Sequence, residues 1–155
     1  MPLDDRNSVS IVLVEDDFFQ YTDIKARLEA EFGDEVRVIT DESEFIEALP
    51  SLAESSPDVF VIDVMLPWHN LDRLTDSVEI SECPPDRTDV HVAGIRLEQD
   101  IRANPVLRNA ITVLFSVLDR TDLPPDTVFV SKGQDIIQLV KHIRRVLVQR
   151  GGQRK

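Results

Sequence analysis

The sequence contains a single cysteine, Cys83, among its 155 residues. A lone thiol excludes an internal disulfide bond and a zinc site built from cysteines, because both need at least two. The apolar runs, such as 11–14 and 59–62, are too short to cross a bilayer. The chain does not open with a charged segment followed by an apolar one, so we expect no signal peptide. These absences predict a cytoplasmic protein that is not inserted in a membrane.

Positive charge is scarce outside the last fifteen residues. The chain has 17 Lys and Arg against 29 Asp and Glu, a net charge of −12. Residues 141–155 hold six of the basic residues and no acidic one, which leaves residues 1–140 with 11 basic and 29 acidic residues, a net of −18. Phosphate groups repel such an acidic body, so we expect no direct DNA binding. We interpret the basic end first as the cationic terminus of a helix, and second as a contact for nucleic acid or an acidic partner.

Short apolar runs alternate with segments of helical periodicity. Five runs predict strands, at residues 9–14, 36–39, 59–62, 111–115 and 128–130. Apolar residues at helical spacing predict four helices: one that ends at Gly33, and others at 41–54, 93–104 and 136–147. Runs that are apolar throughout indicate strands covered on both faces. The pattern therefore predicts one α/β domain over residues 1–150, a doubly wound, five-stranded parallel sheet, followed by a basic tail at 151–155.

Three features interrupt this alternation. Pro50 lies inside the second predicted helix and is expected to shorten or bend it. An insertion at 68–92, after the third strand, has no clear period, and residues 79–81 and 90–92 within it are candidates for a small hairpin. Residues 118–127 are too few and too rich in proline for a full crossover helix. We therefore expect a shortened fourth crossover.

Polar residues follow four of the predicted strands directly: Glu15-Asp16-Asp17, Asp63, Ser116 and Lys132. Ligands of an open parallel sheet bind beyond the carboxyl ends of its strands, so we expect these side chains to converge there. We interpret Asp17 as the cap of the first helix. The other acids would repel one another unless a cation neutralised them, and carboxylate oxygens suit Mg²⁺.

The chain resembles the receiver (phosphoacceptor) domain of two-component response regulators. The resemblance lies in residues 11–17 (IVLVEDD), 61–67 (VIDVMLP), 94–105, 115–116 (FS) and 129–132 (FVSK). The resemblance as a whole extends over roughly residues 9–148, apart from the insertion. An acid pair, an Asp-x-x-Leu-Pro motif, a hydroxyl and a lysine follow four strands in the order typical of that family. The resemblance implies a CheY-like, flavodoxin-like fold.

The resemblance also implies a phosphoacceptor and a metal site. Asp63 is implied to be a carboxylate nucleophile that takes a phosphoryl group from a histidine kinase or a histidine phosphotransfer protein. Asp16 and Asp63 are implied to bind Mg²⁺ directly, Glu15 through water, and Met65 through its backbone carbonyl.

Three further residues are implied to act on the phosphoryl group. Lys132 pairs with its oxygens, Ser116 donates its hydroxyl to them, and Phe129 is the aromatic switch that turns inward as the hydroxyl moves. Metal and lysine together offset the charge of the transferring group. Two positions depart from the family pattern: Val117 stands where a small residue is usual, and Gly133 where a proline is usual.

The implied function is that of a stand-alone receiver, a phosphoprotein of a two-component phosphorelay and not an enzyme with an external substrate. It would carry an aspartyl phosphate, hydrolyse it slowly, and signal by binding a downstream protein; a homodimer remains open. One alternative is a pseudo-receiver that binds a partner constitutively, without phosphorylation. Another is a phosphatase of the haloacid dehalogenase type, which Met65 disfavours because that family needs an acid two positions after its nucleophile.

Overall fold

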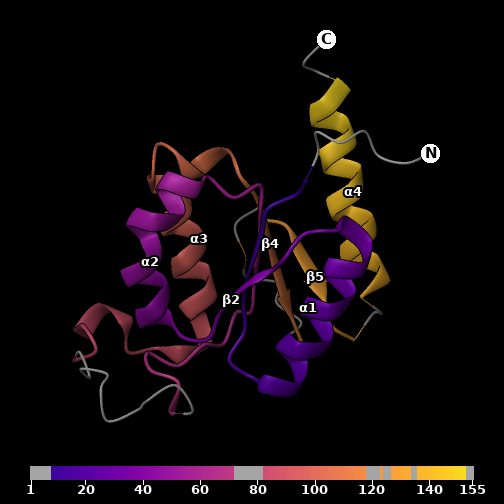
Figure 1. Ribbon diagram of the computed structural model, residues 1–155. Helices are drawn as coiled ribbons and strands as arrows, with labels where there is room; N and C mark the ends of the chain where they lie inside the picture. Colours follow the sequence, from indigo (N-terminus) through magenta and orange to yellow (C-terminus); the bar gives the residue numbers. More distant parts are fainter. Residues whose placement is uncertain (1–7, 72–81, 118–122, 124–126, 134–135, 153–155) are drawn as a thin grey trace.

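Figure 1 shows the computed structural model of the chain, which describes residues 8–71, 82–117, 123, 127–133 and 136–152. Within these residues, five strands form one parallel sheet in the order β2-β1-β3-β4-β5. The strands are β1 (Ile11–Val14), β2 (Arg37–Ile39), β3 (Val59–Ile62), β4 (Ile111–Ser116) and β5 (Phe129–Ser131). The α-helices of this part are α1 (Phe18–Phe32), α2 (Glu42–Ser55), α3 (Ala93–Ala103) and α4 (Ile137–Gly152). The described residues also form three short 3₁₀ turns, η2 (Pro85–Arg87), η3 (Val90–Val92) and η4 (Leu107–Asn109). The predicted strands and their parallel pairing are confirmed.

The helices cover both faces of the sheet, with α2 and α3 on one side and α1 and α4 on the other (Figure 1). Side chains alternate between these faces along each strand. In β1, Val12 and Val14 lie in the core under α2 and α3, whereas Ile11 and Leu13 lie in the core under α1 and α4. Burial on both faces explains why β1 and β3 are apolar throughout. The prediction of a doubly wound sheet is confirmed.

Helix α1 begins and ends where the sequence predicts. The Asp17 side chain accepts a hydrogen bond from the Gln20 backbone N–H, at 2.9 Å, and so caps the first turn. Gly33 ends the helix with a φ of 82°, a left-handed conformation that residues with a Cβ atom rarely adopt. The cap places Glu15 and Asp16 in the short connection between β1 and α1.

Helix α2 continues past Pro50 to Ser55, so the expectation that proline shortens it is wrong. Proline removes one backbone hydrogen bond from the helix interior. Pro50 itself is exposed, while Phe45, Ala48 and Leu52 on either side of it are buried in the core under α2 and α3. The packing of this buried face outweighs the lost hydrogen bond.

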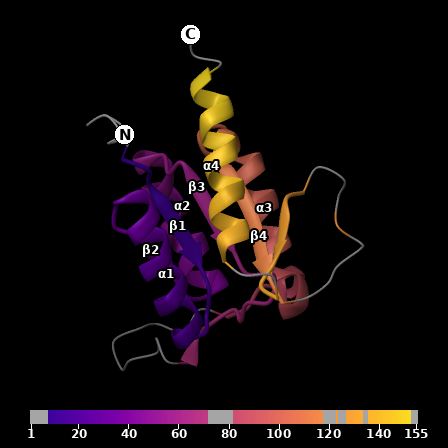
Figure 2. The same ribbon diagram turned by 90° about the vertical axis from the view of Figure 1, so that its right-hand side faces the viewer.

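The insertion differs from the predicted hairpin. Residues 90–92 form the 3₁₀ turn η3, not a strand, because the Asp89 side chain caps the backbone N–H of His91 at 3.0 Å. Residues 79–81, the other half of the predicted hairpin, lie outside the described residues, as do most residues of the fourth crossover. At the other end of the chain, α4 extends to Gly152, two residues into the predicted tail, and its last turns reach beyond the sheet (Figure 2).

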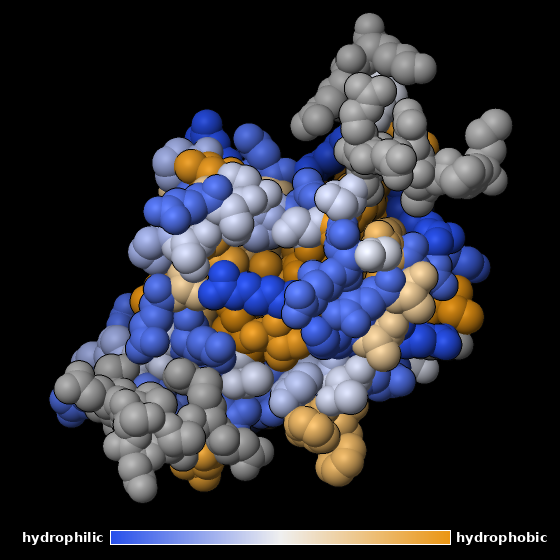
Figure 3. Space-filling model, viewed as in Figure 1, coloured by the Kyte–Doolittle hydropathy of each residue, from blue (hydrophilic) through white to orange (hydrophobic). Residues whose placement is uncertain are grey.

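Polar side chains dominate the helical surface. In Figure 3, hydrophilic residues cover the helices, and apolar residues gather at the centre of this face, between the two helical layers. Among the helices of the described residues, none is long and apolar enough to span a membrane.

Candidate functional site

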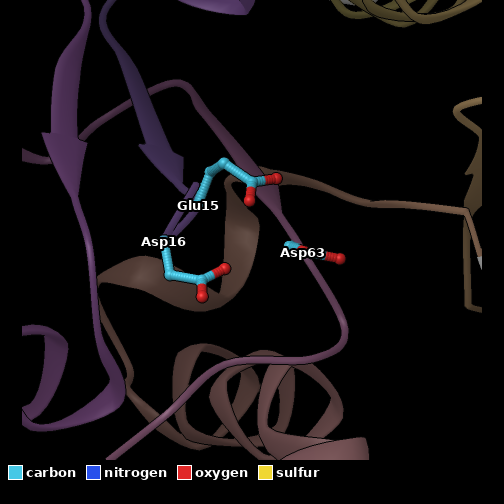
Figure 4. Close-up of side chains that lie close together, drawn as sticks. All are labelled: Glu15, Asp16 and Asp63. Atoms are coloured by element: carbon cyan, nitrogen blue, oxygen red, sulfur yellow. The ribbon is translucent and has the colours of Figure 1, made fainter. Parts of the chain in front are cut away.

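Three carboxylates meet at the carboxyl edge of the sheet, beyond the ends of two adjacent strands. Glu15 and Asp16 follow β1, and Asp63 follows β3. The backbone N–H of Asp63 donates to the Val14 carbonyl at 2.9 Å, which ties the two strand ends together. The three side chains point toward one space (Figure 4), and one oxygen from each lies within 4.8 Å of the others. The predicted convergence of these acids is therefore confirmed.

Burial and mutual repulsion change the proton affinity of this cluster. Glu15 is only 1% exposed, and its burial, with the neighbouring Asp63 carboxylate, raises the pKa of Glu15 to about 7. Burial also raises the pKa of Asp16, with smaller contributions from the Asp63 and Asp17 charges. Keeping these groups ionised close together therefore lowers the stability of the folded chain, and a bound cation would offset this loss.

Lys132 brings positive charge to the three acids from the end of β5. Its ammonium forms an ion pair with Glu15 and lies 3.5 Å from Oδ2 of Asp63. It also donates to the side-chain oxygen of Gln20 at 2.7 Å and lies 5.8 Å from the centre of the Phe115 ring. Sequence reasoning missed Gln20, which the Asp17 cap places in the first turn of α1.

The backbone around Lys132 is fixed by β4. Ser131 pairs with Ser116, and the Lys132 N–H donates to the Ser116 carbonyl at 2.9 Å. The peptide bond to Gly133 is trans, and the Gly133 N–H donates to the Ser131 hydroxyl at 3.2 Å. These contacts direct Lys132 into the cluster without the proline that the family usually has at position 133.

The other residues singled out from the sequence lie in or shortly after strands β3, β4 and β5. Ser116 is buried at the end of β4. Phe129 is half-buried and packs against the core under α2 and α3. Met65 is half-buried two positions beyond Asp63, and Val117 is 68% exposed. The roles implied for Ser116, Phe129 and Met65 remain predictions.

Gly94 allows α3 to touch the backbone at Asp63. Its N–H donates to the Val64 carbonyl at 2.9 Å. A Cβ atom at Gly94 would lie 2.1 Å from the Asp63 carbonyl oxygen and 2.8 Å from the Val64 Cα atom. Because real Cβ atoms do not approach so closely, a side chain at position 94 would displace either α3 or Asp63.

A buried ionic network lies beside the site, and sequence reasoning missed it. Glu42 is fully buried at the start of α2, where its two oxygens accept from Arg87 at 2.7 Å and from Arg96 at 2.8 and 3.0 Å. Arg87 also pairs with Asp100 at 2.9 Å. The network joins the insertion, through Arg87, to α2 and α3. The only hint of this network in the sequence is the i, i+4 spacing of Arg96 and Asp100. That spacing predicts an exposed ion pair on one helix, not a network around a buried glutamate.

The polar start of α2 forms a second group that sequence reasoning missed. Asp41 and Ser43 are 0% and 1% exposed, and the Ser43 hydroxyl lies 2.9 Å from Nδ1 of His69. The side-chain amide of Asn70 donates to the Asp16 backbone carbonyl at 3.1 Å. The loop that follows Asp63 therefore touches both α2 and the acidic cluster.

The donor set of the cluster fits Mg²⁺. Carboxylates are hard oxygen ligands, and Mg²⁺ is usually held by few of them together with waters and phosphate oxygens. Three carboxylates meet one ammonium group here among the described residues, which leaves an excess of negative charge in a partly buried place. Partial exposure of Asp16 and Asp63 leaves room for water and a phosphate oxygen beside the ion.

No protein-family model and no curated protein matches the sequence. Solved structures match the fold along nearly its whole length. The receiver domain of a histidine kinase from Syntrophus aciditrophicus is 22% identical, with a TM-score of 0.63 over 91% of this chain and 91% of that one. The receiver domain of a Francisella response regulator is 21% identical, with a TM-score of 0.63 over 92% of this chain and 98% of that one.

A third match carries a metal ion. The receiver domain of a sensor histidine kinase from Pseudomonas aeruginosa, solved with a magnesium ion coordinated in its active-site cleft, is 20% identical. Its TM-score is 0.59 over 90% of this chain and 97% of that one. The chain therefore has the receiver-domain fold, and the predicted CheY-like, flavodoxin-like fold class is confirmed.

Proposed function

We propose that the chain is a receiver in which Asp63 accepts a phosphoryl group from the phosphohistidine of a histidine kinase or a histidine phosphotransfer protein. The surroundings of Asp63 carry this proposal. Its side chain is 12% exposed at the carboxyl edge of the sheet, with the Lys132 ammonium 3.5 Å away and Glu15 and Asp16 beside it. The ammonium offsets the negative charge of the cluster, and the partly exposed Asp63 carboxylate can be reached by an incoming donor.

The transfer exchanges one bond for another. An Asp63 oxygen attacks phosphorus, a P–O bond forms, and the P–N bond to the donor imidazole breaks. The electron pair of that bond goes to the imidazole nitrogen, and the ring, protonated on its other nitrogen, leaves as neutral histidine. Lys132 pairs with the phosphoryl oxygens throughout. Ser116 donates its hydroxyl to them afterwards, and Phe129 turns inward as that hydroxyl moves.

Asp16 and Asp63 would hold Mg²⁺ directly, Glu15 through water, and Met65 through its backbone carbonyl. The ion, when bound, supplies positive charge that offsets the charge on the phosphoryl oxygens. The slow loss of the phosphoryl group to water would return the chain to its resting state.

The signal would leave the chain by binding to a downstream protein in the cytoplasm. Phe18 and Phe19 are 56% and 82% exposed at the start of α1, directly before Gln20, which contacts Lys132. Their rings contact each other edge to face, 5.6 Å apart. Exposed aromatic side chains next to a reactive site favour a contact with a protein partner.

The test is phosphorylation by acetyl phosphate with and without Mg²⁺, followed by intact mass. We expect the wild-type chain to gain one phosphoryl group only with Mg²⁺, and Asp63→Asn to gain none. Asp58→Asn is the matched control, because Asp58 accepts the Ser10 N–H at the opposite end of β3. This variant should be phosphorylated like the wild type.

A failure of phosphorylation separates two alternatives. A chain that gains no mass and binds no Mg²⁺ is a pseudo-receiver, and the proposal is then wrong. A chain that binds Mg²⁺ and still gains no mass, even with its cognate kinase, would also overturn phosphoacceptance, and would leave a metal-binding interaction module.

A further inference from the structure

The start of α2 is capped by a segment that is distant in sequence. The first backbone N–H groups of a helix lack partners within the helix. In α2, the Glu42 N–H donates to the Pro67 carbonyl at 3.0 Å, and the Ser43 N–H donates to the Trp68 carbonyl at 3.0 Å. Residues 67–70, here called the capping segment, follow Asp63 by only a few positions. The loop that leaves the phosphoacceptor is thus docked on a helix terminus.

Asp41 joins the two parts of this contact with its two oxygens. Oδ1 accepts the Glu44 N–H at 2.7 Å and caps α2. Oδ2 accepts the Asn70 N–H at 2.8 Å and holds the end of the capping segment. Asp41 is 0% exposed, and a buried carboxylate is stable only when such donors and the positive end of a helix dipole surround it.

Asn70 extends this connection to the acidic cluster. Its side-chain amide donates to the Asp16 carbonyl at 3.1 Å, and that carbonyl belongs to the backbone that carries both Glu15 and Asp16. The carboxylates of Glu15, Asp16 and Asp63 repel one another. This repulsion favours opening of the connection between β1 and α1, and the hydrogen bond from Asn70 opposes it. An amide suits this position, because it donates a hydrogen bond without adding a charge that would compete with a metal or repel a carboxylate.

We infer that Asp41 and Asn70 are positioning residues of the metal site, acting through the hydrogen-bonded path from Asp41 to Asn70 to the Asp16 backbone. The inference rests on the proposed function for its metal, while the path itself is independent of it. Mg²⁺ demands near-octahedral geometry, so a small displacement of Asp16 weakens binding. Outer residues that orient ligands typically contribute about 10–100-fold to metal affinity.

Two variants interrupt the path at different points. Asn70→Ala removes the amide that reaches Asp16 and leaves the Asn70 backbone in place. Asp41→Ser keeps an oxygen that can cap α2, but one oxygen cannot also hold the Asn70 N–H. Asn104→Ala is the matched control: the Asn104 side chain accepts backbone N–H groups of Val106 and Leu107 at the end of α3, away from the cluster.

Two measurements test the effect of these variants, and the first is made without metal. Hydrogen exchange of the metal-free chain, followed by mass spectrometry, should be faster in residues 15–20 of Asn70→Ala and Asp41→Ser than in the wild type or Asn104→Ala. Calorimetric titration should show Mg²⁺ affinity lowered about tenfold in both path variants and unchanged in Asn104→Ala. Thermal unfolding shows that all variants are folded.

The outcomes separate this inference from the proposed function. Unchanged exchange in residues 15–20 of both path variants overturns the inference, whatever the metal does. Faster exchange with unchanged Mg²⁺ affinity overturns the positioning role as well. A wild-type chain without Mg²⁺ binding overturns the metal site and its positioning residues, while the exchange experiment still decides whether Asn70 holds the connection between β1 and α1.

Discussion

At the residue scale, single atoms decide how the site is assembled, and Gly94 is the clearest case. An added Cβ atom would lie 2.1 Å from the Asp63 carbonyl oxygen. We expect Gly94→Ala to lower the free energy of unfolding by about 2 kcal/mol or more, because the helix and the strand end must move apart. It should also slow phosphorylation by acetyl phosphate, since Asp63 shifts. Chemical denaturation and intact mass measure the two effects.

Gly151→Ala is the matched control for this change. Gly151 lies in the last turn of α4, and no atom lies within 4 Å of a Cβ built there. The same replacement should therefore stabilise the chain by up to about 1 kcal/mol, through helix propensity alone. Equal effects of the two replacements would contradict the steric role of Gly94.

Glu15 makes the site sensitive to pH. Its pKa is raised to about 7 in the folded chain from an ordinary value of 4.5, so the folded state binds more protons than the unfolded state between these values. The metal-free chain therefore loses stability as pH rises through this window, by the linkage of protonation to folding. Mg²⁺ needs the ionised form, so we expect its affinity to rise about fivefold from pH 6 to pH 7, about tenfold from pH 6 to pH 8, and to level off above pH 8.

Calorimetric titrations of the wild type and of Glu15→Gln across this pH range test the effect. The variant should bind Mg²⁺ more weakly and with a much smaller pH dependence below pH 7. An affinity that is flat from pH 6 to pH 8 in the wild type would show that the Lys132 ammonium keeps Glu15 ionised.

At the scale of elements, the insertion is fastened to α2 and α3 by buried ion pairs. The Arg96 and Glu42 side chains are 15% and 1% exposed. Arg96→Met removes two of the hydrogen bonds that the buried Glu42 carboxylate accepts and leaves it paired with Arg87, so we expect the free energy of unfolding to fall by about 2 kcal/mol. Arg144→Met is the control, because Arg144 and Glu31 are 56% and 43% exposed and their pair should contribute less than about 1 kcal/mol. Urea unfolding at pH 7 measures both, and similar losses would contradict the difference.

The strands and helices also show how much of this fold can be predicted from the sequence. The fully buried strands β1 and β3 are apolar throughout, so they could be located, and the acids directly after them identified the acidic cluster. The bounds of helix α2 were predicted to within one residue, but the shortening expected at Pro50 was wrong, because a proline on the exposed side costs less than burial of the opposite face gains. The burial of Glu42 could not be predicted, because its partner Arg96 lies 54 positions away and charged residues at a helix start are ordinarily exposed.

At the scale of the whole molecule, the net charge of −12 acts on every part of the chain. Self-repulsion at this charge opposes the compact state, and salt screens it. We expect the melting temperature in EDTA at pH 7.5 to rise by a few degrees between about 20 and 200 mM NaCl. At about pH 4.5, where many carboxylates are protonated, the same change should have little effect. A melting temperature that falls with salt at pH 7.5 would show that the ion pairs outweigh the repulsion.

The start of α2 receives both described ends of the insertion. Asn70 is held by Asp41, and Arg87 is held by Glu42, the next residue along the helix. These two contacts hold the described residues on either side of 72–81 against the same helix terminus. Closing a longer loop adds only about 0.6 kcal/mol for each doubling of length. A change of length in this part of the chain would therefore cost little free energy, and it need not displace Asp63.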